Sequence, residues 1–449
     1  MQSSQYKMTA THWGAYRAEV RDGRVVAIHG VEGDPDPSPI AQGMLDTLDD
    51  PCRIGRPMVR RGFLERGCQS DRSQRGAEPF VALSWDEAEE LVANELKRVC
   101  ELHGNDAIFA GCYGWASAGR FHHAPSQVHR FLNCLGGYTR SVDTYSFAAG
   151  EVILPHVLGD LHRLLAHHTS WPSIIDHTDL VVAFGGLPLK NSQINAGGSG
   201  RHVQRDYMRA ARAAGVGFVN ISPVKGDVDD FLNAQWLAPV PNTDVAIMLG
   251  LAHTLVVEGL HDWQFLRSHC VGVDPFLEYL LGHDDGQPKD ASWAAAISGL
   301  TAEIIRELAR RMAGGRTMLS VSWSLTRQHH GEQPYWMAVT LAAMLGQIGL
   351  PGGGVGFGYA AVNSIGNQAG HLRWAALDQG VNPVESFIPV ARIADMLLHP
   401  GTAFDYNGIC HSYPEIRLVY WLGGNPFHHH QDINRLLRAW RRPETIIVH

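Results

Sequence analysis

Residues 84–111, "SWDEAEELVANELKRVCELHGNDAIFAG", join a helix-like segment to a strand-like one. Ser84 and Glu87 have the spacing of a capping box, in which each side chain bonds the backbone of the other residue. Apolar side chains then recur at helical spacing, at Ala88, Leu91, Val92, Leu96 and Val99. Gly104 marks the end of the helix, and "DAIFAG" is typical of a short strand. The stretch predicts a helix followed directly by a strand.

The same alternation recurs along the chain. "DLVVAFGG" precedes the helix-like "GRHVQRDYMRAARAAG" and the strand-like "VGFVNIS". "TMLSVSWS", "YWMAVTLAAMLGQIG" and "IRLVYWLGGNP" repeat the pattern. Strands that alternate with helices favour α/β domains with doubly wound, mostly parallel sheets. Residues 355–390, which are rich in Gly, Ala and Asn, are expected to form a long loop.

Size and composition limit the class of protein. A chain of 449 residues is too long for one compact core, so we expect two to four domains. A net charge of -8 without a Lys/Arg-rich block argues against nucleic acid as a partner. The most apolar stretches, such as "VAIMLGLAHTLVV", are too short to span a bilayer. The first residues, "MQSSQYKMTATHWG", contain neither an apolar signal region nor twin arginines, so a cytoplasmic location without membrane contact is expected.

The cysteines do not form a ligand motif. Seven are spread along the sequence and none occurs in a CxxC pair. Disulfide scaffolds, zinc ribbons and iron–sulfur clusters bound by cysteine are therefore not expected. A reduced chain is the simplest interpretation.

Several strand ends are candidates for ligand binding. "FGGLPLKNSQ", "NISPVKGDVDD" and "WLGGNPFHHHQD" place glycines and polar residues where parallel sheets bind ligands, although such turns are common. The loop "CYGWASAGRFHHA", residues 112–124, is ambiguous. Cys112, His122 and His123 suggest a metal site, whereas Tyr113 and Trp115 suggest a substrate wall. Neither a strict GxGxxG motif nor a Walker loop is present.

Longer stretches resemble one family. "FAGCYGW", "DTYS", "TSWP", "HHGEQPYWMAVTLAAMLGQIGLPGGG" and "YWLGGNPFHHHQDINRL" are similar to the molybdopterin S/N-oxide reductases, which reduce dimethyl sulfoxide, trimethylamine N-oxide or biotin sulfoxide. The resemblance implies a multi-domain molybdopterin oxidoreductase fold. It implies a small β-rich segment at 1–60, an α/β domain from 61–157 and 370–449, and a nucleotide-binding-like α/β domain at 158–369. The C-terminal domain that closes over the cofactor is expected to be absent, which makes the chain a fragment and a second chain a candidate partner.

The resemblance also assigns roles to residues. Ser146 in "VDTYS" matches a serine that ligates molybdenum, and Tyr113 and Trp115 match a tyrosine and a tryptophan that face the reacting oxygen. In this interpretation Cys112, His122 and His123 are structural or support the cofactor. The expected contacts to bis(molybdopterin guanine dinucleotide) are Trp115, Lys190, Ser222, Asp244, Trp323, Arg327, His330, Gly424, Asn425, His429 and Gln431. No iron–sulfur cluster is expected.

The expected reaction is two-electron reduction of a sulfoxide or N-oxide by oxygen-atom transfer to Mo(IV), with release of water. The electron donor is not identified, anaerobic respiration is the expected setting, and the periplasm is the alternative location for this family. Two other functions stay open. One is a non-catalytic pterin-binding remnant, and the other is a molybdenum hydroxylase or transhydroxylase with a reshaped pocket.

The chain departs from the family pattern near the predicted ligand. Phe147, Ala148 and Ala149 stand where Thr-Gly-Ala is usual, and the larger Phe147 is expected to reshape the pocket or displace a pterin. Thr326 replaces a common glutamine, and Ser222 replaces an aspartate, which weakens one expected nucleotide contact. These departures affect the predicted substrate more than the predicted fold.

Overall fold

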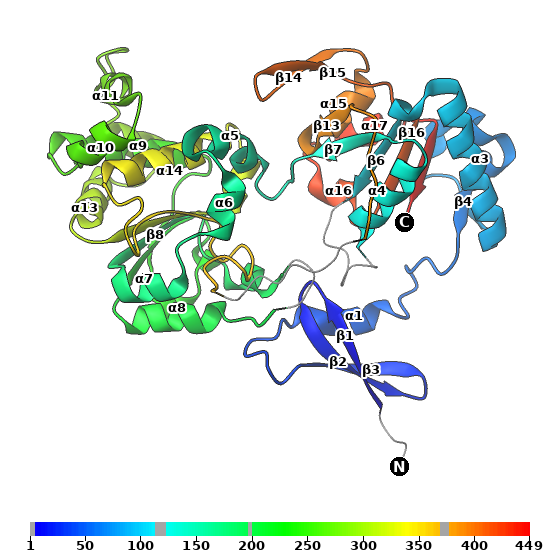
Figure 1. Ribbon diagram of the computed structural model, residues 1–449, viewed down its shortest axis with the longest axis horizontal. Coiled ribbons are helices and arrows are strands. Elements are labelled where there is room, and N and C mark those ends of the chain that lie inside the picture. The colour runs from blue at the N-terminus through cyan, green and yellow to red at the C-terminus, as the bar shows by residue number, and fades with distance from the viewer. Residues whose placement is uncertain (1–4, 113–122, 196–199, 369–376) are drawn as a thin grey trace.

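A computed structural model describes residues 5–112, 123–195, 200–368 and 377–449. The chain forms a small antiparallel sheet and two larger units, each built on a five-stranded parallel sheet (Figure 1). Tyr113, Trp115 and His122 lie outside the described residues. None of the helices in the described ranges is long and apolar enough to cross a membrane.

The small sheet comes first in the chain. It consists of β1 (Gln5–Thr11), β2 (Gly14–Arg21) and β3 (Arg24–Gly30), and α1 (Ile40–Thr47) packs against β3. The segment that follows this sheet is joined to the unit of residues 180–357 by a buried hydrogen bond, in which His202 Nδ1 lies 2.6 Å from Asp34 Oδ2. Arg205 Nε and Asp36 Oδ2 form a second link of 3.1 Å.

The unit of residues 180–357 contains the sheet β10-β9-β8-β11-β12. Its strands span Gln235–Leu237, Gly217–Ile221, Leu180–Phe184, Thr317–Val321 and Gly354–Phe357, and all neighbours are parallel. Every residue of β8 and β11 is buried, because helices cover both faces of the sheet. This confirms the doubly wound fold that the alternating sequence predicts.

Two different sets of helices cover the two faces of this sheet. One core cluster joins the sheet to α9 (Asp244–Val257), α12 (Ala291–Ser298), α13 (Ala302–Ala313) and α14 (Gln333–Met344). The opposite cluster includes α7 (Trp171–His177) and α8 (Gln204–Ala213). The helices α10 (Trp263–His269) and α11 (Val273–Leu281) pack outside α14 and α9 respectively. Both α9 and α14 are apolar on almost all sides and largely buried.

The second parallel sheet has the order β13-β7-β6-β16-β17. Its strands span Phe387–Pro389, Thr139–Val142, Ile108–Cys112, Leu418–Leu422 and Thr445–Val448. α3 (Trp85–His103) and α4 (Ala124–Cys134) cover one face, whereas α15 (Ile393–Leu398) and α17 (Ile433–Ala439) cover the other. The hairpin β14–β15 (Ala403–Tyr406, Ile409–Ser412) and the pair β4–β5 (Met58–Arg60, Phe80–Ala82), joined by α2 (Arg61–Arg66), complete this unit. The capping box at Ser84 and Glu87 is present, as predicted.

The chain passes from one unit to the other after β7 and returns before β13. On the outward path, α5 (Ala148–Leu158) and α6 (Leu161–Ala166) bury Leu154 and Leu161 in the core of the 180–357 unit. On the return path, the described part of residues 358–386 contains neither helix nor strand. The predicted loop at 355–390 is therefore slightly shorter, because β12 reaches Phe357 and β13 begins at Phe387.

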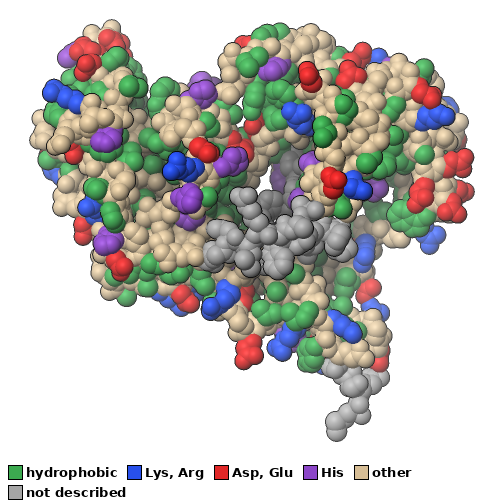
Figure 2. All heavy atoms as spheres, in the orientation of Figure 1, with side chains coloured by type: hydrophobic (Ala, Val, Ile, Leu, Met, Phe, Trp, Pro, Cys, Tyr) green, Lys and Arg blue, Asp and Glu red, His purple; other side chains and the backbone are tan. Residues whose placement is uncertain are grey.

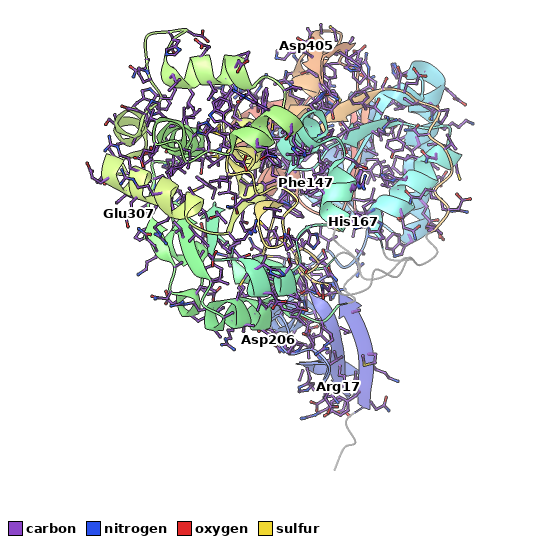
Figure 3. All side chains as sticks on the ribbon, turned by 60° about the vertical axis from the view of Figure 1, so that its left-hand side comes forward. Arg17, Phe147, His167, Asp206, Glu307 and Asp405 are labelled. Atoms are coloured by element: carbon purple, nitrogen blue, oxygen red, sulfur yellow. The ribbon has the colours of Figure 1, made fainter. Side chains whose placement is uncertain are left out.

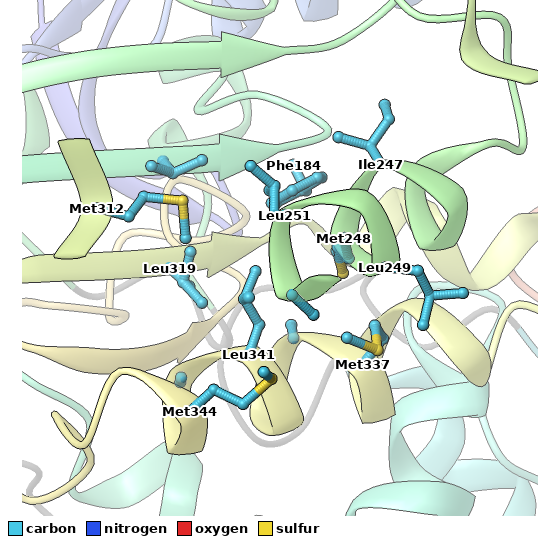
Figure 4. Packing of buried hydrophobic residues seen from close by; sticks show 14 of the residues in the cluster. Phe184, Ile247, Met248, Leu249, Leu251, Met312, Leu319, Met337, Leu341 and Met344 are labelled. Carbon is cyan, nitrogen blue, oxygen red and sulfur yellow. The ribbon is translucent and has the colours of Figure 1, made fainter. Parts of the chain in front are cut away.

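The central cluster gives a test of this fold (Figure 4). Leu341 of α14 is 0% exposed, so we expect Leu341→Ala to lower the free energy of unfolding by about 2–5 kcal/mol through lost burial and a new cavity. Val257, at the end of α9, is 58% exposed, and Val257→Ala should change stability by no more than about 0.5 kcal/mol. Urea unfolding measures both; equal effects would contradict the placement of α14.

Candidate active site at the carboxyl ends of two sheets

The predicted site residues that the structure describes follow the carboxyl ends of parallel strands. Ser146 follows β7, and Gly424 follows β16 in the same sheet. Lys190, Ser222 and Trp323 follow β8, β9 and β11 in the other sheet. Because all strands of a parallel sheet end at one edge, the fold gathers these residues along two edges, where α/β proteins bind ligands. Figure 2 shows several histidine side chains around the middle of the molecular face that is turned toward the viewer.

Ser146 lies in the turn that joins β7 to α5 and is partly buried. Its backbone N–H donates to Thr144 Oγ1 at 3.1 Å, and Tyr145 Oη donates to the carbonyl of Val390 at 2.5 Å. The turn begins at Asp143, whose φ of 67° is a left-handed conformation that costs energy for a residue with a side chain. The hydroxyl of Ser146 therefore lies on a short turn that is fixed from within its own unit.

The other unit holds the same turn. Arg327 Nη1 donates to the carbonyl of Tyr145 at 3.2 Å, and Thr326 Oγ1 accepts a 2.8 Å hydrogen bond from the backbone N–H of Ala149. Phe147, the residue before α5, provides no side-chain cap to this helix. Thr326 thus satisfies one of the free N–H groups of the first helical turn from a distant part of the sequence.

Phe147 lies between the two larger units (Figure 3), and its ring packs against aromatic side chains of the 180–357 unit. The centroid of its ring lies 4.3 Å from that of Trp323 and 5.8 Å from that of Phe357. The sequence predicted that Phe147 reshapes the pocket or displaces a pterin. The ring packs against a hydrophobic core and against Trp323, itself a predicted cofactor contact, so the effect of Phe147 on the pocket stays a prediction.

Trp323 carries an unused hydrogen-bond donor. Its indole N–H is buried and has no partner among the described residues. A Cβ on Gly358 would lie 2.0 Å from this nitrogen, so only glycine, with its φ of 86°, lets the loop after β12 approach so closely. A buried N–H without an acceptor is costly, which favours a ligand oxygen or nitrogen at this place.

Asp244 and His330 line one cavity of about 360 Å³. Asp244 begins α9 and is 7% exposed, and burial raises the pKa of its carboxyl. Gln328 Nε2 approaches Asp244 Oδ2 at 3.5 Å, which is a long contact for a hydrogen bond. The cavity is lined by Asn242, Asp244, Val245, Gln328, His329, His330, Gln333 and Pro334. Sequence reasoning missed Asn242 and Gln328, although Gln328 directly precedes the quoted stretch that begins at His329.

The predicted residues after β16 surround the short helix α16 (Pro426–His429). Asn425 caps this helix by accepting from the N–H of Phe427 at 3.0 Å, and Gln431 Nε2 donates to the carbonyl of Ala391 at 2.6 Å. Partial loss of solvation, followed by the charge of the neighbouring His428, lowers the pKa of His429. Gly424 has a φ of 66°, and Gly424, Asn425 and His429 are exposed. These groups lie at the edge of one sheet, whereas Asp244 and His330 lie in the other unit.

Ser222 and Lys190 differ in their surroundings. Ser222 is 1% exposed, and its hydroxyl donates to Asp227 Oδ2 at 2.7 Å, which commits this group to the turn after β9. Sequence reasoning did not single out Asp227, which accepts this hydrogen bond; the predicted cofactor contact of Ser222 stays a prediction. A Cβ on Gly186 would lie 2.5 Å from Asp227 Cβ, so glycine is needed there. The side chain of Lys190 is exposed.

An acidic group stands on α5, five positions after Ser146. Burial, reinforced by the charge of Asp143, raises the pKa of Glu151 to about 7. One carboxyl oxygen of Glu151 is buried and lacks a partner in the described ranges. Tyr406 Oη donates to Asp143 Oδ1 at 2.8 Å, and burial also raises the pKa of Asp143. Glu151 therefore changes its protonation near neutral pH, beside the turn that carries Ser146.

The histidines do not form a metal cluster in the part of the chain that the structure describes. No group of three or more His, Cys, Asp or Glu side chains there could hold an ion. His123 precedes α4, and its Nδ1 lies 2.7 Å from Ser126 Oγ.

Sequence comparisons give a consistent family assignment. The family described as "Molybdopterin oxidoreductase" matches residues 53–449, and its N-terminal domain matches residues 9–48. A biotin sulfoxide reductase of Cereibacter sphaeroides is 51% identical over 92% of this chain and 56% of its own length. A dimethyl sulfoxide/trimethylamine N-oxide reductase of the same organism is 46% identical over 98% of this chain and 55% of its own. A trimethylamine-N-oxide reductase of Haemophilus influenzae is 44% identical over 98% and 54%.

A solved structure has a similar fold. Acetylene hydratase from Pelobacter acetylenicus matches with a TM-score of 0.62 and 17% identity, over 98% of this chain and 60% of its own. Identity at this level supports the fold alone. The chain spans about half the length of the curated relatives it matches.

Glu151→Gln tests the protonation of the group beside Ser146. Since the pKa of Glu151 rises from 4.5 to about 7 on folding, its neutral form stabilises the fold fully below pH 4.5. This contribution is lost as the pH rises through about 7. We expect Glu151→Gln to flatten the decline in melting temperature between pH 5 and 8, and to exceed the wild type at the upper end. Glu307→Gln, at an exposed position of α13, should leave the slope unchanged. Equal slopes in wild type and Glu151→Gln would contradict the raised pKa.

Proposed function

Since the chain belongs to the molybdopterin oxidoreductase family, we propose that it forms the cofactor-binding part of an enzyme that reduces a sulfoxide or an N-oxide. The observation that carries the proposal is the turn of Ser146, which is held by both units at the carboxyl edges of their sheets. The names of the relatives favour this reaction over a molybdenum hydroxylase or a non-catalytic remnant.

The described residues fit a pterin cofactor with a guanosine diphosphate end. Trp323 offers a buried N–H that has no partner in the described part of the chain, and Asp244 offers a buried carboxylate in a cavity. Guanine has adjacent N–H donors that suit a carboxylate, and phosphate suits the exposed cations Lys190 and Arg327. We propose the bis(molybdopterin guanine dinucleotide) form, without an iron–sulfur cluster, because the sequence has no CxxC motif.

When bound, the cofactor supplies a metal that accepts an oxygen atom from the substrate and receives two electrons from a donor. In this proposal Ser146 ligates the metal, and Arg327 and Thr326 fix the turn on which Ser146 lies. Tyr113 donates a hydrogen bond to the substrate oxygen as negative charge gathers there, and Trp115 forms a wall of the pocket. The two protons of the released water enter from the site, where Glu151 is one group that titrates near neutral pH.

We also propose a cytoplasmic enzyme that serves anaerobic respiration, with an electron donor still to be identified. Fractionation of cells grown with and without trimethylamine N-oxide tests both parts of this proposal. A periplasmic fraction that carries the protein would contradict the first part.

Substitution of Ser146 tests the proposed metal ligand in protein that carries its cofactor. Ser146→Ala should lower the turnover of dimethyl sulfoxide with reduced viologen by at least about 100-fold and remove an oxygen ligand from the X-ray absorption spectrum of molybdenum. Ser146→Cys should replace that oxygen by sulfur. Ser268→Ala, at an exposed serine of α10, is the matched control. Unchanged spectra in both Ser146 variants would show that another group binds the metal.

Asp244→Asn tests the proposed guanine pocket without molybdenum. In the full chain purified free of cofactor, we expect Asp244→Asn to weaken the binding of guanosine diphosphate (GDP) by about 10- to 100-fold, because one charged acceptor is lost. Since burial raises the pKa of Asp244, the affinity of the wild type should fall as the pH is lowered and the carboxylate is protonated. Asp274→Asn, exposed on α11, should bind GDP as the wild type does. Calorimetric titration measures all three proteins; equal affinities would remove Asp244 from the pocket.

A further inference from the structure

Three consecutive residues connect the cavity at Asp244 with the turn of Ser146. Gln328 lines the cavity and donates toward Asp244. Arg327, the residue before it, donates to the carbonyl of Tyr145, and Thr326 accepts from the N–H of Ala149. The last two contacts lie on either side of Ser146, one residue before it and three residues after it. The short segment 326–328 therefore contacts both the cavity at Asp244 and the turn of Ser146.

The segment 326–328 is held firmly where it leaves β11. Its first two residues, Thr326 and Arg327, end a 3-10 helix at Trp323–Arg327. Tyr335 Oη donates to the carbonyls of Ser322 and Trp323 at 3.2 and 3.0 Å. A Cβ on Gly331 would lie 2.4 Å from the carbonyl oxygen of Thr326, so the chain packs closely on its other side. A closely packed segment transmits a displacement to its neighbours instead of absorbing it.

The two ends of the segment have unequal contacts. At the Ser146 end, the hydrogen bond between Thr326 and Ala149 is short, at 2.8 Å. At the cavity end, the contact between Gln328 and Asp244 is 3.5 Å, which leaves room for both side chains to rearrange when a ligand donates to Asp244. α5 depends on Thr326 for the cap of Ala149, because Phe147 provides none. A change at Gln328 therefore reaches the first turn of α5 through two peptide units.

We propose that residues 326–328 are a positioning element that couples a guanosine diphosphate group bound at Asp244 to the position of Ser146. The inference rests on the proposed function, since it takes the guanine end of the cofactor to bind in that cavity. Thr326 is a positioning residue, because it acts on Ser146 through Ala149. Coupling of this kind is reciprocal, so a fixed Ser146 turn also favours the bound nucleotide.

Hydrogen exchange of the full chain, purified without cofactor, tests the coupling independently of turnover. The probe is GDP, and the readout is the exchange rate of the peptide that contains the amide of Ala149. We expect saturating GDP to slow that exchange by roughly 5- to 50-fold in the wild type, since the amide opens less often when Thr326 is held. In Thr326→Val, which loses the acceptor at similar volume, GDP should bind without slowing the exchange. Thr326→Ser should restore the effect.

Thr254→Val is the matched control, because its hydroxyl bonds the carbonyl of Gly250 within α9, the helix that begins with Asp244. This variant should keep both GDP binding and the slowed exchange. A wild type that does not bind GDP would overturn the proposed guanine pocket and this inference together. A wild type that binds GDP without a change at Ala149, or equal slowing in Thr326→Val, would overturn the coupling alone. Loss of GDP binding by Thr326→Val would place Thr326 in the pocket itself and would also overturn it.

Discussion

The parallel hydrogen bonding of the two five-stranded sheets is the constraint on which the rest of the structure depends. Each parallel strand needs a crossover that returns the chain to the same starting edge, and these crossovers cover the faces of the sheet with helices. Side chains within β8 and β11 are consequently all buried and apolar or small. The polar side chains that can bind a ligand therefore lie in the loops that follow the carboxyl ends of the strands. The position of the candidate site follows from the strand order before any side chain is considered.

Several residues with a strained backbone conformation lie near the same edges. Non-glycine residues with positive φ occur at Asp143 after β7, Ala360 after β12, and Asn242 and His330 around the cavity of Asp244. Each such conformation costs about 1–3 kcal/mol and persists only where neighbours enforce it. The hydrogen bond from Tyr406 to Asp143 and the full burial of Ala360 are enforcing contacts of this kind. The folding energy of the two cores thus supports turns that would not form by themselves.

Contacts between distant segments complete the unit that carries Ser146. Arg75 donates to the carbonyls of Trp440, Pro443 and Glu444, at 2.6, 2.8 and 3.0 Å, and burial lowers the pKa of its guanidinium to about 10. These bonds fix the segment before β17 to residues that precede α3. Because strand order depends on such long-range contacts, the sequence periodicity that predicts each helix and strand does not predict the order of the sheet.

Local signals in the sequence predicted the elements well and the site only in part. The capping box at Ser84 and the apolar helix α14 depend on neighbours within a few residues, and both are present. Thr326 was interpreted only as a departure from a family pattern. Its hydrogen bond with Ala149 spans 177 residues, so the spacing of residues in the sequence does not predict it. The packing of Phe147 on Trp323 escaped prediction for the same reason.

Two acidic groups near these edges, the buried Asp244 and the partly buried Glu151, bear on the choice of ligand. Asp244 and Glu151 both lose solvation on folding, and burial raises the pKa of each carboxyl. Because its pKa is about 7, the carboxyl of Glu151 becomes uncharged by binding a proton below that pH. Asp244, by contrast, faces a cavity that a ligand can enter. A ligand that brings N–H donors stabilises the charged form of Asp244. Its anionic part then requires cations, and Lys190 and Arg327 present exposed cationic side chains after β8 and β11 of the same sheet. N–H donors joined to phosphate are the chemistry of a guanine nucleotide, so these charges are consistent with the guanine dinucleotide form of the cofactor that we propose.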